Sequence, residues 1–83
     1  MAQQVATVQT TIKAIMGTRE FALGVIDARA GRNPRSDYAT WEINDQWNYE
    51  RGRAWAVAAP RSVVLKRGGK ITAEALRFAA DII

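Results

Sequence analysis

The stretch that decides the fold is Asn44-Asp-Gln-Trp-Asn-Tyr-Glu-Arg-Gly-Arg-Ala-Trp-Ala-Val-Ala-Ala59. Asn44 and Asp45 can accept hydrogen bonds from the free N–H groups of a first helical turn, and Pro60 cannot continue a helix. The stretch therefore predicts a helix of about four turns. Its apolar residues at helical spacing predict one buried face, made of Trp47, Ala54, Trp55 and Ala58.

A second helix is predicted from Arg19 to Ala30, with Thr18 as its N-cap and Gly31 at the left-handed position that often ends a helix. Both helices carry a glycine at their centre, Gly24 and Gly52, where a glycine costs about 1 kcal/mol relative to alanine. We expect the two helices to cross at these glycines, with their backbones close together. The predicted buried face of the second helix consists of Phe21, Val25 and Ala28, widened by Leu23 and Ile26.

The other segments before Pro60 are less regular. Residues 5–16 fit a helical stripe, which we favour, although their threonines and β-branched residues also suit a strand. Residues 31–37 contain an Asn-Pro pair and are predicted to form a polar linker. Residues 38–43 follow as a short helix or as an extended segment, and we expect Trp41 and Ile43 to pack back on the helical pair. The candidate caps of such a short helix are Ser36 and Asp37.

The last third of the chain predicts a small β-element and a terminal helix. Residues 62–65 suit a short strand or an extended run, and residues 66–70 suit a turn or a hairpin tip. Thr72 is the expected N-cap of a helix over residues 73–83. The fold class expected for the single domain, residues 1–83, is therefore mainly α. It comprises three to four helices around a helix–loop–helix unit, with a β-hairpin near 62–71 as the alternative to an extended run.

The composition limits the chemistry that the chain can perform. It has 83 residues, 12 Lys and Arg against 8 Asp and Glu, a net charge of +4, no Cys and no His. Disulfides, thiolate metal sites and imidazole bases are therefore excluded. Nine of the twelve cations are Arg, a bias that favours an anionic partner but also fits a solvated surface. Without a signal segment or an apolar run of about eighteen residues, the chain is expected to be cytoplasmic, with no membrane contact.

No pattern indicates an active site. Glu42 and Asp45 could share a helix face, but acid–base or metal chemistry would need further ligands from elsewhere. Asp27 beside Arg29 is interpreted as a solvated or paired surface charge. Gly68-Gly69 lacks the spacing of a phosphate-binding P-loop. We therefore predict no catalytic residues, no metal and no cofactor.

Binding of an anionic partner is the function class that the basic residues favour. Arginines cluster after the second helix and along the central one, and two lysines and an arginine surround the Gly-Gly pair. Such cations can contact phosphates while aromatic rings stack on unpaired bases, although the aromatic cluster between Tyr38 and Trp55 is predicted to be mainly core. The candidate nucleic-acid or partner-binding residues are Arg29, Arg32, Arg35, Tyr38, Arg51, Arg53, Lys66, Arg67 and Lys70.

Residues 21–55 resemble the ribosome modulation factor family of small helical proteins. The matching features are Phe21-Ala-Leu-Gly24, then Gly31, Asn33-Pro34 and Tyr38, then Trp47, Gly52 and Trp55. Three residues separate Pro34 from Tyr38, and Gly52 follows Trp47 by five, spacings that differ from the family pattern. The resemblance implies a helix–loop–helix unit that binds ribosomal RNA, with Tyr38 available for stacking. The RNA-contacting arginines that it implies are Arg29, Arg32, Arg35, Arg51 and Arg53.

The sequence thus predicts a non-enzymatic binding protein whose partner is RNA or the ribosome. The alternative is a small phage-type inhibitor that blocks a host protein or nucleoprotein complex, such as a defence or transcription complex, through an acidic protein surface. The chain also ends on the apolar pair Ile82-Ile83. This end either packs on the core or forms a surface for homo-oligomers.

Overall fold

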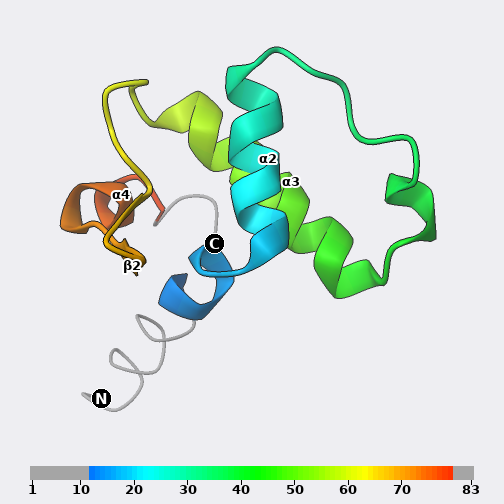
Figure 1. Cartoon of the computed structure of the whole chain (residues 1–83), viewed down its shortest axis with the longest axis horizontal. Helices are drawn as coiled ribbons and strands as arrows, with labels where there is room; N and C mark the ends of the chain where they lie inside the picture. Colours follow the sequence, from blue (N-terminus) through cyan, green and yellow to red (C-terminus); the bar gives the residue numbers. More distant parts are fainter. Residues whose placement is uncertain (1–11, 80–83) are drawn as a thin grey trace.

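A computed structural model describes residues 12–79, and within them the chain is mainly helical with a short β-hairpin, which is the expected fold class (Figure 1). Residues 12–16 are helical and lead into the central pair of helices. The elements that follow are α2 (Arg19–Arg29), the 3₁₀ helix η1 (Tyr38–Thr40), α3 (Ile43–Ala58), β1 (Lys66–Arg67), β2 (Lys70–Ile71) and α4 (Ala73–Arg77).

Helices α2 and α3 cross at their two glycines, as expected, and Figure 1 shows them lying across each other. A Cβ atom built on Gly24 would lie 2.2 Å from the carbonyl oxygen of Tyr49. One built on Gly52 would lie 2.1 Å from the carbonyl oxygen of Phe21. Real Cβ atoms do not approach backbone oxygens so closely, so any other residue would force the helices apart.

The predicted buried face of α3 is wrong except for Trp55. Tyr49, Gly52 and Trp55 are its buried residues, whereas Trp47 is half exposed and Ala54 and Ala58 are exposed. Because Gly52 must face α2 at the crossing, the residues one turn to either side of it face inward too. The expected burial of Ile26 on α2 is wrong for the same reason, since Gly24 fixes which side of α2 faces α3.

The helix termini follow the sequence signals in part. The Thr18 hydroxyl accepts a hydrogen bond from the Phe21 N–H at 3.2 Å, and Gly31 has a φ of 70°, both as expected. The expected capping of α3 by Asn44 and Asp45 is wrong. The helix begins one residue earlier, at Ile43, and its N-cap Glu42 makes no side-chain capping bond.

Residues 38–43 contain the short helix that was one of the two alternatives, although its N-cap Asp37 makes no side-chain capping bond. Trp41 packs edge-on against Tyr49 with ring centroids 5.4 Å apart, so its expected return to the helical pair is confirmed. Ile43 is 56% exposed, so the same expectation for Ile43 is wrong. The Gln46 side chain donates hydrogen bonds to the carbonyl oxygens of Tyr38 and Trp41, which ties this segment to α3.

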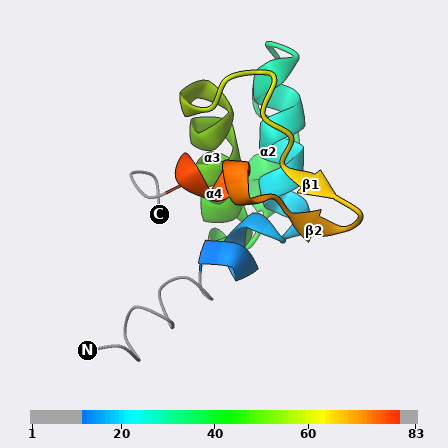
Figure 2. The same ribbon diagram turned by 90° about the vertical axis from the view of Figure 1, so that its left-hand side faces the viewer.

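The hydrophobic core joins the helical pair to the C-terminal elements. Trp55 donates its indole N–H to the carbonyl oxygen of Ala75 at 2.8 Å, and Lys66 donates to that of Gly17 at 3.4 Å. Figures 1 and 2 both show residues 12–16 beside the hairpin and α4. The buried apolar residues of this core are Met16, Phe21, Val25, Trp55, Ala59, Val63, Ala75 and Ala79.

The β-element is shorter than expected. Residues 62–65 are not a strand; the antiparallel pairs are Lys66 with Ile71 and Arg67 with Lys70, across a Gly-Gly tip. The expected cap of α4 is confirmed, because the Thr72 hydroxyl accepts from the Ala75 N–H at 3.0 Å. The predicted helix over residues 73–83 is too long, since Phe78 is its C-cap and two further bonds to the carbonyls of Ala75 and Leu76 close the turn.

Two further expectations, for residues 5–11 and for the apolar end Ile82-Ile83, lie outside the described residues. Between residues 12 and 79, no helix has the length and apolar character needed to cross a membrane.

Candidate functional site

A buried carboxylate, Asp27, lies at the centre of the arginine cluster after α2. It is 1% exposed, so its interpretation as a surface charge is wrong. The Tyr49 hydroxyl donates to its Oδ2 at 2.7 Å, and Arg35 donates its Nε–H to the same oxygen at 3.2 Å. Arg32 lies 3.6 Å from Oδ1. Asp27 therefore ties α3 and the linker after α2 to α2 itself.

The surroundings of Asp27 fix the protonation of this cluster. Burial raises the pKa of Asp27, but the Tyr49 hydrogen bond and the charges of Arg35 and Arg32 outweigh it and hold that pKa below its usual value. Burial, and then hydrogen bonding to Asp27, raises the pKa of Tyr49. Asp27 is therefore charged and Tyr49 neutral over the physiological pH range, and two arginines are bound to a carboxylate of the same chain.

Arg29 is also engaged within the fold. Its guanidinium donates to the carbonyl oxygens of Val63 at 3.0 Å and Pro60 at 3.3 Å, and it lies over the Trp55 ring at 5.0 Å from the centroid. The Arg61 guanidinium in turn donates a hydrogen bond to the backbone carbonyl oxygen of Arg29 at 2.9 Å. Arg29 thus joins the end of α2 to the segment after α3.

The candidates on and before α3 pack against aromatic rings. Arg53 lies over the Tyr49 ring at 5.8 Å, and Arg51 lies over the Trp47 ring at 5.9 Å. The Tyr38 hydroxyl donates to Glu50 at 2.8 Å, and its ring contacts those of Trp41 and Tyr49. Burial, together with this hydrogen bond, raises the pKa of Tyr38 to about 12. Tyr38 is half-buried rather than presented as a free stacking platform.

The remaining candidates, Lys66, Arg67 and Lys70, lie together on the hairpin. Gly68 and Gly69 form its tip with φ of 61° and 78°, and Arg67 and Lys70 are exposed. Within residues 12–79, no ion pair joins Arg67 or Lys70 to an acidic side chain. The structure therefore divides the nine candidates into a group bonded around α2 and α3 and a group on the hairpin.

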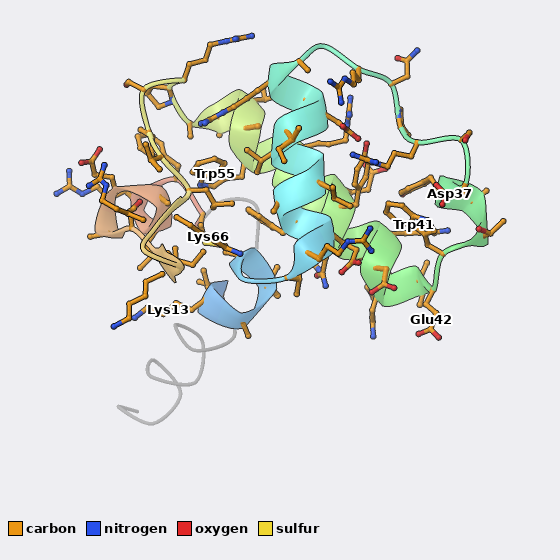
Figure 3. All side chains as sticks on the ribbon, viewed as in Figure 1. Lys13, Asp37, Trp41, Glu42, Trp55 and Lys66 are labelled. Carbon is orange, nitrogen blue, oxygen red and sulfur yellow. The ribbon has the colours of Figure 1, made fainter. Side chains whose placement is uncertain are left out.

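Further cations surround the hairpin group. Together with the hairpin group itself, residues 12–17 and 63–79 contain five cations and one carboxylate, Glu74. Figure 3 shows Lys13 and Lys66 on the same side of the molecule. We define the basic end as Lys13, Lys66, Arg67, Lys70 and Arg77.

The opposite side of the molecule carries acidic residues. Figure 3 shows Asp37 and Glu42 there, next to Trp41 and far from Lys13 and Lys66. A cavity of about 210 Å³ lies at this side and has side chains of both signs in its lining: Arg19, Glu20, Leu23, Arg35, Asp37, Trp41 and Asp45. The basic end offers an anionic partner four exposed cations, Lys13, Arg67, Lys70 and Arg77, on the side away from Asp37 and Glu42.

Sequence reasoning missed Asp27, although a signal for it was present. Asp27 follows Gly24 by three residues, so it lies on the side of α2 that faces α3. A carboxylate there needs bonding partners, and Arg32 and Arg35 follow shortly after it in the linker. Within residues 12–79, no cluster of three or more His, Cys, Asp or Glu side chains could hold a metal ion.

Comparisons of the chain with protein-family models, with curated proteins and with solved structures gave no significant match.

Proposed function

We propose that the protein is a non-enzymatic binding protein that contacts the phosphates of RNA through its basic end. The observation that carries this proposal is the charge of that end, where five cations accompany one carboxylate within residues 12–17 and 63–79. Cations of this kind attract a polyanion from a distance and release its counterions on contact.

The backbone of the hairpin, as well as its charge, favours contact with phosphates. Gly68 and Gly69 carry no side chains at the tip, and no atom of residues 12–79 lies within 4 Å of the positions where their Cβ atoms would be. A phosphate chain can therefore approach the tip closely, with Arg67 and Lys70 directly beside it. Arg67 offers paired N–H donors to one phosphate, and Lys70 offers a mobile point charge.

The arginines around α2 have a different role in this proposal. Arg35 and Arg32 neutralise Asp27, and Arg29 bonds two backbone carbonyls, so an RNA phosphate would have to displace these contacts. They support the binding surface by holding the helical pair together. In this proposal the phosphate contacts are therefore the hairpin residues together with Lys13 and Arg77, and Arg29, Arg32 and Arg35 are left out.

The resemblance of residues 21–55 to the ribosome modulation factor family supports ribosomal RNA as the RNA in question. The glycine crossing of α2 and α3 is compatible with the helix–loop–helix unit that this resemblance implies. RNA on the small ribosomal subunit is accordingly the first target to test.

The experiment compares two charge reversals of equal size. Arg67→Glu changes the basic end, whereas Arg19→Glu changes an 81% exposed side chain beside the acidic side. Affinity for a single-stranded RNA and for purified small ribosomal subunits is measured over a range of salt concentrations. Arg67→Glu is expected to weaken binding at least tenfold and to reduce the slope of log K against log salt by about 0.7 for each lost contact.

Arg19→Glu serves as the matched control, with the same change in net charge. If both variants lost RNA affinity equally, the change in net charge alone would explain the loss. That result would contradict a binding surface at the hairpin. Unchanged affinity in Arg67→Glu would contradict the proposal outright.

The second candidate function is a protein-binding inhibitor, and one observation favours it. Ile43, Trp47 and Val57 are exposed on α3, and apolar side chains in such a row commonly contact another protein. The two functions differ in their response to ribonuclease. Ribosome-bound protein is released by ribonuclease treatment of a cell lysate, whereas a stable complex with a host protein survives it.

A further inference from the structure

Helix α3 is apolar on two opposite sides. Its inner side packs on α2 through Tyr49, Gly52 and Trp55. Its outer side presents three large apolar residues to solvent, with exposed fractions of 56% for Ile43, 51% for Trp47 and 83% for Val57. A surface helix normally carries one apolar stripe, and a helix that carries two is usually covered on both. The outer face, defined as Ile43, Trp47, Ala54, Val57 and Ala58, therefore suits a partner.

The middle of the outer face is a shallow hollow of about 250 Å³ lined by Trp47, Glu50 and Arg51. The Arg51 guanidinium lies over the Trp47 ring there, and Glu50 accepts the Tyr38 hydrogen bond. Large apolar side chains lie towards the N-terminal end of the face, at Ile43 and Trp47. Exposed alanines, Ala54 and Ala58, lie towards its C-terminal end.

We propose that this face binds the same face of a second copy of the chain, with the two α3 helices antiparallel about the point between Glu50 and Arg51. In this arrangement Trp47 of one copy is level with Ala54 of the other. Ile43 is level with Ala58 in the same way. Large side chains therefore meet small ones at both ends of the contact, which is what close helix packing requires.

The centre of this contact is also balanced in charge. Glu50 of one copy is level with Arg51 of the other, and the two-fold symmetry repeats this pair. Two cations and two anions therefore meet, and the centre of the interface buries no net charge. A two-fold interface of this kind needs one self-complementary patch, which a single helix face supplies.

The size of the face indicates how tightly it binds. The 16 residues of α3 extend about 24 Å, and we expect a helix pair of this length to bury on the order of 1,000 Å² in total. That area is at the lower limit for a specific interface, so the dimer is expected to be weak and to depend on protein concentration. The basic end lies outside this interface. Failure of the dimer test would therefore leave the proposed RNA contact unaffected, and failure of the RNA test would leave the dimer unaffected.

The first test measures the mass of the purified full-length chain by sedimentation over a range of concentrations. We expect wild type to pass from monomer to dimer, and Val57→Glu to raise the dissociation constant at least tenfold. Ile26→Glu is the matched control, because it places the same charge at a 53% exposed isoleucine on α2 and should leave the dissociation constant unchanged. A wild-type monomer at every concentration, or equal weakening by both variants, would overturn the proposal.

The second test determines the direction of the pairing. The chain has no cysteine, so Ile43→Cys and Ala58→Cys each introduce one thiol. We expect a mixture of the two variants to form a disulfide-linked dimer under oxidation and each variant alone to remain unlinked, since identical residues lie far apart in the antiparallel pair. Linking of each variant to itself would overturn the antiparallel arrangement. A different protein bound to this face, with the pure chain monomeric, would overturn self-association.

Discussion

The basic side chains around α2 and those on the hairpin differ in what they contact, although in the sequence both are clusters of basic residues. Arg32 and Arg35 are bound to a buried carboxylate of their own chain. Arg67 and Lys70 are exposed and, within residues 12–79, make no ion pair. The number of basic residues in a segment therefore does not show which of them are free to contact a partner. That depends on whether the fold places a hydrogen-bond acceptor beside them.

The contrast begins at the glycine crossing. Because Gly24 and Gly52 bring the two backbones together, Asp27 on α2 and Tyr49 on α3 come within hydrogen-bonding distance. The arginines of the linker then neutralise the buried charge. Among residues 12–79, no buried carboxylate lies beside the hairpin, and Arg67 and Lys70 remain exposed.

The largest effect is expected from Gly52→Ala. A Cβ at this position meets the Phe21 carbonyl oxygen at 2.1 Å, and backbone cannot give way as a side chain can. We expect the free energy of unfolding to fall by at least about 3 kcal/mol in chemical denaturation. Gly31→Ala is the control, since nothing lies within 4 Å and only its positive φ matters, at about 1 kcal/mol. Similar losses in the two variants would refute the close crossing.

The second-largest loss of stability is expected from Asp27→Asn, which removes the buried charge and leaves Arg35 and Arg32 without their anionic partner. We expect a loss of about 2–3 kcal/mol in the free energy of unfolding, because one side of a buried ion pair is lost. Asp37→Asn, on an exposed residue in the same linker region, should change stability by less than about 0.5 kcal/mol. If Asp27→Asn were as harmless as its control, the buried cluster would not hold the linker.

The pH dependence of stability sharpens the same comparison. The folded-state pKa of Asp27 lies below its unfolded value, so its contribution is fully present above about pH 4 and is lost as pH falls through the folded pKa. We therefore expect the unfolding free energies of wild type and Asp27→Asn to converge below about pH 4, as followed by denaturation at several pH values. A constant difference between them down to pH 2 would contradict this assignment.

The smallest changes in stability are expected from replacing one arginine in each of the two groups of cations. Arg35→Ala should lower the free energy of unfolding by about 1–2 kcal/mol, because it removes a charged hydrogen bond to a buried acceptor. Arg67→Ala should change it by less than about 0.5 kcal/mol. Melting curves of the two variants provide the comparison, and equal losses would erase the distinction between the groups.

The sequence predicted the fold where local chemistry determines it. Thr18, Thr72 and Gly31 mark helix ends because capping and a positive φ depend on neighbouring residues only. The glycine crossing was predictable because a central glycine is costly in a helix unless close contact requires it. The buried face of α3 was predicted wrongly because Trp47 and Trp55 are equally apolar and hydrophobicity alone does not separate them. The position of Gly52 at the crossing does, since Trp55 lies near it on the helix surface and Trp47 lies on the other side.

The candidate site was predictable in part. The hairpin cations were identified from the sequence, because the Gly-Gly pair between basic residues indicates an exposed tip. The internal engagement of Arg29, Arg32 and Arg35 depends on Asp27 and on backbone carbonyls that are distant in the sequence. The Arg29 partners, Pro60 and Val63, are defined only by the packing of the fold, whereas Asp27 lies close to Arg32 and Arg35 in the sequence.

The most direct test of the account is an amide NMR titration of the isotope-labelled chain with single-stranded RNA at moderate salt. We expect chemical-shift changes to concentrate on residues 66–71, with Lys13 and Arg77, and residues 27–35 to change little. Shift changes concentrated on Arg29, Arg32, Arg35 and Arg53, with the hairpin unaffected, would show that the paired arginines are the RNA contacts and would contradict the account.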